Sequence, residues 1–308
     1  MEKFIYVGIS ILLAIIGGSY WLIAWCLLVI AYLIMKAMKQ LQVEELLPGA
    51  FIKISGIVLI GVIIFRTFCY DYYLIPSESM APLLNQGDYI LVSKLAYGPR
   101  MPSHLLDIPT LNIFHKLGNK KRESYLTHNQ PYQRLNKDLK VKHKDIILFN
   151  HPQSKKTYIK RCVGLPGDTI EIKHDMLFRN QRMVREDYAY FEALPKTTKS
   201  VFSNQKDENK YRSSWSPIQI PYRGMHIELN EDNLKQYASI INQFEGKNIF
   251  TKNQLFYVDG KLNNSFTFSQ NYYYVLGDHR RRSLDSRSWG LLPESHIIGK
   301  NVLTLVSN

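Results

Sequence analysis

The amino-acid sequence predicts a mostly β protein that follows N-terminal transmembrane helices. Two long apolar runs occupy residues 4–34 and 51–69, and a spanning helix needs about 20 such residues. From residue 86 onward, short runs of β-branched and aromatic residues alternate with turn residues. With 308 residues and 45% hydrophobic content, the chain can hold a membrane anchor and one sizeable folded unit or two small ones.

The first apolar run, residues 4–34, is interrupted mainly by Gly17-Gly18-Ser19. One tilted helix and a tight hairpin both fit, but a hairpin would have arms of about 14 residues, which is short for two passes. We therefore favour a single pass, which places the N-terminus outside, whereas a hairpin would leave it in the cytoplasm. A cleaved signal peptide is disfavoured because the apolar run continues past any small-residue cleavage site.

The second apolar run completes a membrane anchor over residues 1–69. Residues 35–50 carry lysines and glutamates and read as a short cytoplasmic loop under the positive-inside rule. Residues 51–69 are free of charge except for Lys53 and Arg66 near the ends, where such side chains reach the interface. Everything from Tyr70 onward is therefore expected outside the membrane.

Local patterns predict the elements of the folded part. Residues 231–244 have helical apolar spacing, an acidic first turn and a capping Asn230, so we expect a helix. Residues 100–144 are polar and basic and indicate a solvated surface insertion. Short strands, with a hairpin turn at Asp259-Gly260, are expected at 89–92, 145–149 and 157–163.

The net charge and the histidine and cysteine content limit the range of possible functions. A net charge of +13 suits anionic lipid or nucleic acid, and the apolar runs favour lipid. The nine histidines show no His-Glu-x-x-His pattern, and the three cysteines are too scattered for a disulfide framework. No metal site and no cofactor are indicated.

Ser79 is the candidate nucleophile, and it follows the second apolar run closely. It lies 14 residues after Phe65, a stretch that extends to about 50 Å at most, so it stays near the membrane surface. A serine hydroxyl needs a base and oxyanion donors to act. Lys160 could be that base if burial lowers its pKa from about 10.4. Taken alone, Ser79 could instead cap a turn and Lys160 could be an exposed strand lysine.

Four sequence blocks stand out along the chain: Ser79-Met80-Ala81-Pro82, Gly87-Asp88-Tyr89-Ile90-Leu91-Val92-Ser93-Lys94, residues 158–168 and residues 277–293. In these blocks and their order the chain resembles the bacterial type I signal peptidases (leader peptidases), which are Ser/Lys-dyad membrane endopeptidases. The close resemblance covers about a third of the part that follows the expected anchor.

The resemblance implies a role for each candidate site residue. Ser79 is the nucleophile and Lys160 the base, and the Ser77 hydroxyl forms the oxyanion hole with the Ser79 backbone N–H. Ser283 orients the Lys160 amine. The supporting network implied around the Ser283 loop consists of Asp278, Asp285 and Arg287.

The family cuts after small residues at the first and third positions before the bond. The positions here that match its substrate-binding walls are Ile75, Leu84, Tyr158 and Ile159, although each could equally be core. The chain departs from the best-known members at Glu78, where they carry glycine, at Leu83, and at His279, Arg281 and Arg282.

The resemblance also implies a domain organisation and a location. Residues 70–168 and 272–308 would form a catalytic domain with a signal-peptidase-like β-fold, and 169–271 an inserted accessory β-domain. The expected enzyme cleaves N-terminal signal peptides from exported preproteins through an acyl-enzyme. It would be a multi-pass protein of the bacterial cytoplasmic (inner) membrane with its catalytic domain on the periplasmic face. Signal peptides of preproteins and membrane lipid are the implied partners, the protein export machinery is a candidate, and no nucleic acid is implied.

Two other functions fit parts of the sequence. A LexA-like self-cleaving Ser/Lys protein shares the dyad, but it should carry a DNA-binding helix-turn-helix instead of two membrane spans. A catalytically inactive, basic, membrane-tethered binding protein would not need Ser79, Lys160 and Ser283 together. Activity is the observation that separates these alternatives.

Overall fold

A computed structural model describes most of the chain after the first apolar run, in two units. The units are Met1–Asp71 with Gly98–Lys137, and Tyr72–Tyr97 with Asp138–Asn308. The greater part of 4–34, of the 35–50 loop and of the 100–144 insertion lies outside the described residues. The described residues are 29–30, 49–102, 108, 133–135, 140–152, 154, 156–191 and 214–305.

The first unit contains helix α4, Gly49–Phe68. Its two hydroxyl side chains bond within the helix: Ser55 Oγ donates to the Ile52 carbonyl at 3.0 Å, and Thr67 Oγ1 donates to the Ile63 carbonyl at 2.7 Å. Ile57, Ile60 and Ile64 are exposed along it. Within the stretches described here, no helix has both the length and the hydropathy needed to cross a membrane.

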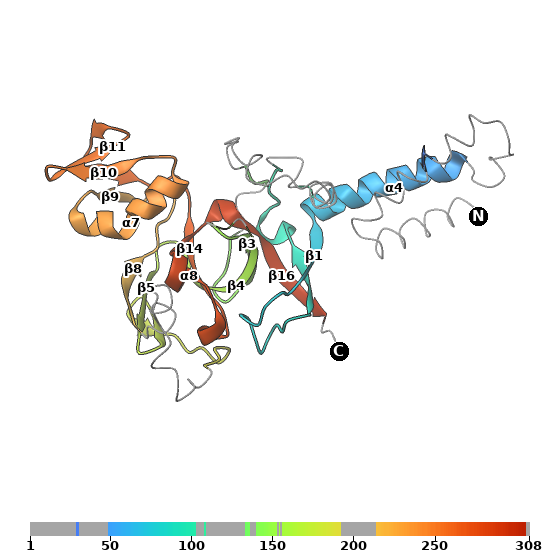
Figure 1. Cartoon of the computed structure of the whole chain (residues 1–308), viewed down its shortest axis with the longest axis horizontal. Coiled ribbons are helices and arrows are strands. Elements are labelled where there is room, and N and C mark those ends of the chain that lie inside the picture. The colour runs from blue at the N-terminus through green and yellow to red at the C-terminus, as the bar shows by residue number, and fades with distance from the viewer. Residues whose placement is uncertain are drawn as a thin grey trace. The chain divides into compact units, whose positions relative to one another are not determined.

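The second unit is built on a 7-stranded sheet, which confirms the prediction of mostly β structure. Its strands come from distant parts of the sequence, so that red β16 lies beside green β3 in Figure 1. In sheet order they are β1 (Tyr70–Leu74), β2 (Tyr89–Ser93), β16 (Ile297–Leu305), β3 (Ile146–Asn150), β4 (Thr157–Gly164), β14 (Tyr272–Leu276) and β15 (Leu292–Pro293). The predicted strands at 89–92, 145–149 and 157–163 are thus confirmed to within one residue at each end.

Smaller sheets lie between β4 and β14 in the sequence. One has the order β7-β6-β5-β8, one β10-β11-β12 and one β13-β9. Their strands are β5 (Thr169–Lys173), β6 (Met176–Arg179), β7 (Arg182–Met183), β8 (Trp215–Gln219), β9 (His226–Glu228), β10 (Ile249–Lys252), β11 (Leu255–Val258), β12 (Lys261–Leu262) and β13 (Ser265–Thr267). Short helices complete the described chain: η1 (Leu95–Tyr97), η5 (Arg280–Arg282), α8 (Ser286–Trp289) and η6 (Glu294–His296).

Helix α7, Glu231–Phe244, has the bounds that its sequence predicts. The Asn230 side chain caps it by accepting from the Asn233 backbone N–H at 2.8 Å. Its apolar stripe is buried in the core. The predicted Asp259-Gly260 turn joins β11 to β12, and both residues have positive φ, as a type I′ hairpin requires.

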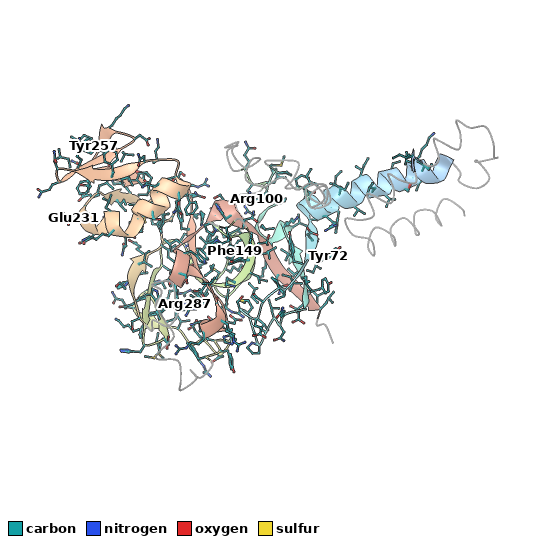
Figure 2. The ribbon with its side chains drawn as sticks, in the orientation of Figure 1. Tyr72, Arg100, Phe149, Glu231, Tyr257 and Arg287 are labelled. Atoms are coloured by element: carbon teal, nitrogen blue, oxygen red, sulfur yellow. The ribbon has the colours of Figure 1, made fainter. Side chains whose placement is uncertain are left out.

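Three hydrophobic clusters hold the second unit together. The largest joins the small sheets and α7 to Val163, Tyr272 and Tyr274 of the large sheet. A second lies around Phe149, which Figure 2 shows amid the large sheet. The third contains Met80, the residue after Ser79, and so anchors the loop that carries the serine.

Candidate active site

Ser79 lies in the loop between β1 and β2, on a short turn fixed by its neighbour. Met80 is fully buried, and its carbonyl accepts a hydrogen bond from the Leu84 N–H at 3.0 Å. The Ser79 carbonyl accepts from the His279 N–H at 3.2 Å, which ties the loop to the turn after β14. These contacts on both sides fix the direction of the Ser79 side chain.

Lys160 reaches Ser79 from the middle of β4. The ladder pairs Lys160 with Ile147 of β3, so the lysine is carried by an inner strand of the sheet. Its Nζ lies 2.7 Å from Ser79 Oγ and 2.8 Å from the Ile159 carbonyl. The two residues are 81 positions apart in the sequence, and the fold brings them into direct hydrogen-bonding contact.

Burial changes the acidity of the Lys160 ammonium group. Removal from water lowers its pKa to about 8, and this effect outweighs the opposing charges of Asp285 and Asp278. Arg287 adds to the lowering. An amine with this pKa is neutral in a useful fraction of molecules near neutral pH, and a neutral amine can accept the Ser79 proton.

Ser77, the predicted oxyanion-hole residue, lies beside Ser79. Its Oγ is 3.3 Å from Ser79 Oγ, and Ser77 is exposed whereas Ser79 is buried. A hydroxyl in this position can turn toward an oxyanion that forms on a substrate attacked by Ser79.

Ser283 is buried next to the backbone of the site. A side chain on Gly277 would put its Cβ 2.2 Å from Ser283 Oγ and 2.5 Å from the Ser79 carbonyl oxygen. Only glycine therefore fits at 277, which the sequence analysis did not single out. Lys160 Nζ forms hydrogen bonds with Ser79 and Ile159. Among the described residues, Ser283 Oγ has no hydrogen-bond partner of normal geometry.

Asp285 and Arg287 form a buried ion pair that supports the Ser283 loop. The carboxylate accepts from Arg287 Nε at 2.8 Å and from the Gly277 N–H at 3.0 Å. Burial disfavours ionisation of Asp285, but the Arg287 charge and these hydrogen bonds lower its pKa overall. Arg287, labelled in Figure 2, also donates to the Arg280 carbonyl at 2.7 Å.

Asp278 pairs with a residue that the sequence analysis missed. Arg161, the neighbour of Lys160, binds it through two hydrogen bonds of 2.8 and 2.5 Å. The carboxylates of Asp278 and Asp285 thus have separate arginine partners. A basic residue directly after the candidate base was the available signal for Arg161, but its partner lies 117 positions away.

The candidate substrate-binding residues divide between two clusters. Ile75, Leu84 and Ile159 are buried together with Met80. Tyr158 packs instead with the second cluster, where its ring centroid is 4.6 Å from that of His151. Its ring centroid is also 5.6 Å from Lys160 Nζ.

One of the positions at which the chain departs from the family pattern forms an ion pair. Glu78, beside Ser79, forms an ion pair with Arg282, and both side chains are about half exposed. Among the described residues, no group of three or more His, Cys, Asp or Glu side chains is arranged to hold a metal ion.

Comparison with known proteins places the chain in a family. The model of the signal peptidase family, peptidase S26, matches residues 49–306. The chain belongs to this family and is a serine endopeptidase of the signal peptidase I type.

Two relatives with similar sequences support the assignment. Signal peptidase I of Buchnera aphidicola subsp. Baizongia pistaciae is 32% identical over 260 residues, which cover 80% of this chain and 72% of that protein. Signal peptidase I of Pseudomonas aeruginosa is 28% identical over 255 residues, covering 79% and 67%. A crystal structure of a signal peptidase I from Enterococcus faecalis V583 matches with 24% identity and a TM-score of 0.28, covering 53% of this chain and 97% of that one.

Proposed function

We propose that this chain is a membrane-anchored endopeptidase that removes signal peptides from exported preproteins with a Ser79/Lys160 dyad. The contact that carries the proposal is the 2.7 Å separation of Lys160 Nζ and Ser79 Oγ. The lowered pKa of Lys160, about 8, supports a neutral amine as the base. Membership of the signal peptidase family supports preproteins with signal peptides as the substrates.

The proposed reaction has two stages. Lys160 takes the proton of Ser79 as Oγ attacks the scissile carbonyl, and the Ser77 hydroxyl and the Ser79 N–H bind the oxyanion. Lys160 then returns the proton to the leaving amine and an acyl-enzyme remains. Lys160 next activates a water molecule, which releases the signal peptide from Ser79.

Ser283 and the two aspartates have supporting roles in this proposal. Ser283 orients the amine, and the Asp285–Arg287 and Asp278–Arg161 pairs hold the surrounding turn in place. A buried ion pair that loses one partner leaves an uncompensated charge, so these turns depend on both members of each pair.

Specificity for small residues is proposed to come from the walls around Ser79. Ile75, Leu84 and Ile159 pack against Met80, the residue after Ser79. In this proposal they would leave little room for a large side chain. Tyr158 would contribute from the neighbouring position on β4. Side chains larger than those of alanine or serine would then be excluded from the first and third positions before the scissile bond.

The organisation and location follow the same proposal. Residues 1–69 would anchor the chain, residues 70–168 and 272–308 would form the catalytic domain, and 169–271 the accessory domain. In such an anchor the exposed isoleucines of α4 would contact lipid. The catalytic domain would face the periplasm, where preproteins emerge from the export machinery.

The test of this function is the position and selectivity of cleavage. A purified preprotein with an Ala-x-Ala site is incubated with the full chain, and the product is identified by N-terminal sequencing. We expect one cut after the second alanine. Replacing that alanine by phenylalanine should lower kcat/KM at least about 10-fold, since even one methylene changes selectivity by about 10-fold or more. Equal cleavage of both substrates, or none of either, would contradict the proposal.

A further inference from the structure

The segment Glu186–Tyr190 lies outside the four family-like blocks, yet it contacts the supports of both Ser79 and Lys160. It follows β7 in the sequence and belongs to the 169–271 region. Because its contacts are with residues of the 277–282 turn and of β4, it is called the clamp segment below.

The clamp segment holds the 277–282 turn through one buried ion pair and two backbone bonds. Glu186 binds the guanidinium of Arg280 through both carboxylate oxygens, and the side chains are 8% and 3% exposed. Arg280 in turn donates to the Gly277 carbonyl at 3.1 Å. The Tyr190 N–H donates to the Asp278 carbonyl at 2.7 Å, and the Tyr190 carbonyl accepts from Arg280 at 2.9 Å.

The same segment also reaches the strand that carries Lys160. The Arg161 guanidinium carbon lies 4.2 Å from the centroid of the Tyr188 ring, a cation–π contact. The Tyr188 hydroxyl donates to Glu186 at 3.1 Å, so the two clamp side chains hold one another. Arg161 is thereby fixed from one side by Asp278 and from another by Tyr188.

We propose that Glu186 and Tyr188 are positioning residues for the dyad, acting through Arg280 and Arg161. The turn they hold provides the His279 N–H that binds the Ser79 carbonyl, and Gly277, which allows Ser283 to approach. Neither clamp residue touches the reacting atoms. Their role is to keep Oγ and Nζ at a productive separation, and the inference rests on the proposed function.

The test compares Glu186→Gln with a matched charge removal in the same segment. Asp187 pairs with Arg185 on the surface, where their side chains are 69% and 89% exposed, so Asp187→Asn is the control. A misplacement of about 1 Å can cost about 100-fold in rate, so we expect Glu186→Gln to lower kcat at least about 10-fold. KM should change less than about 2-fold, because the lost interaction affects the chemical step. Asp187→Asn should keep the wild-type kcat.

Further variants separate positioning from folding. Glu186→Asp should restore part of the kcat, and Tyr188→Phe, which keeps the ring over Arg161, should lose less kcat than Tyr188→Leu. Melting temperatures are measured for every variant. If Glu186→Gln does not fold, the Tyr188 pair decides the question, and equal kcat in Tyr188→Phe and Tyr188→Leu overturns the inference.

The remaining outcomes also test the inference, and they separate it from the proposed function. Wild-type kcat in a folded Glu186→Gln protein, or an equal loss in Asp187→Asn, overturns the inference alone and leaves the proposed function standing. Absence of preprotein cleavage by the wild type overturns the proposed function and this inference with it.

Discussion

At the residue scale, the chemistry depends on the protonation state of Lys160. An exposed lysine has a pKa near 10.4 and is a poor acceptor at neutral pH. Burial inside the sheet lowers the pKa of Lys160 to about 8, even though Asp285 and Asp278 lie close enough to oppose the change. The cost of burying this amine is the physical basis of its proposed function as a base.

The pH dependence of activity follows from this pKa. Below about pH 8 the Lys160 amine is mostly protonated and cannot accept the Ser79 proton. We therefore expect kcat/KM to rise about 10-fold per pH unit in that range and to level off above it. A profile measured on a preprotein substrate checks this, with Lys156→Met, which removes an exposed lysine of the same stretch, as the control. A flat profile between pH 6 and 9 would remove Lys160 as the base.

At the element scale, the helices and strands that could be predicted are those whose sequence signals lie within the element itself. Helix α7 carries its own cap, its acidic first turn and its apolar spacing within 15 residues, so its sequence was sufficient. The strands around Lys160 were found from their β-branched runs. The insertion of β16 between β2 and β3 was not, because that pairing depends on contacts between distant segments.

The site shows the same division between local and distant information. Ser79, Lys160 and Ser77 were identified through family-like blocks, and the fold brings them together. Glu186 has no motif of its own, and its partner Arg280 lies 94 positions away, so only the folded chain reveals the pair. The role of Gly277 was not predicted, because a side chain there would collide with Ser283 and with the Ser79 carbonyl, and only the fold brings these groups close.

The cap of α7 provides a test of stability apart from activity. Asn230→Ala removes the acceptor of the Asn233 N–H, and such a change costs about 1 kcal/mol. We expect a lower midpoint of chemical denaturation with unchanged kcat on a peptide substrate. Asn230→Asp keeps the cap and should remain close to the wild type. A loss of kcat in Asn230→Ala would mean that α7 contributes to the site.

At the scale of the whole molecule, the proposal joins a membrane anchor to a β-rich catalytic part. The proposed anchor rests on the sequence, in which two apolar runs precede the family-like blocks. The 20-residue helix α4 carries exposed isoleucines, which suit lipid better than water. A serine placed soon after such a helix would meet its substrates at the membrane surface.

This arrangement predicts how the chain fractionates. The full chain should remain in the membrane pellet after extraction with alkaline carbonate, and a shortened chain that begins at Tyr70 should be released more readily. Protease added outside spheroplasts should digest the part after Tyr70. Complete release of the full chain by carbonate would contradict the proposed anchor.

Ser79 and Lys160 are proposed to perform the cleavage together, and preprotein cleavage by three variants measures this directly. Ser79→Ala removes the nucleophile, Lys160→Met removes the amine while keeping an unbranched side chain, and Lys156→Met is the exposed control. We predict that the first two lose cleavage by at least about 1,000-fold while remaining folded, because each removes a member of one catalytic unit. Lys156→Met should cleave like the wild type. Cleavage at the wild-type rate by folded Ser79→Ala or Lys160→Met would contradict the account.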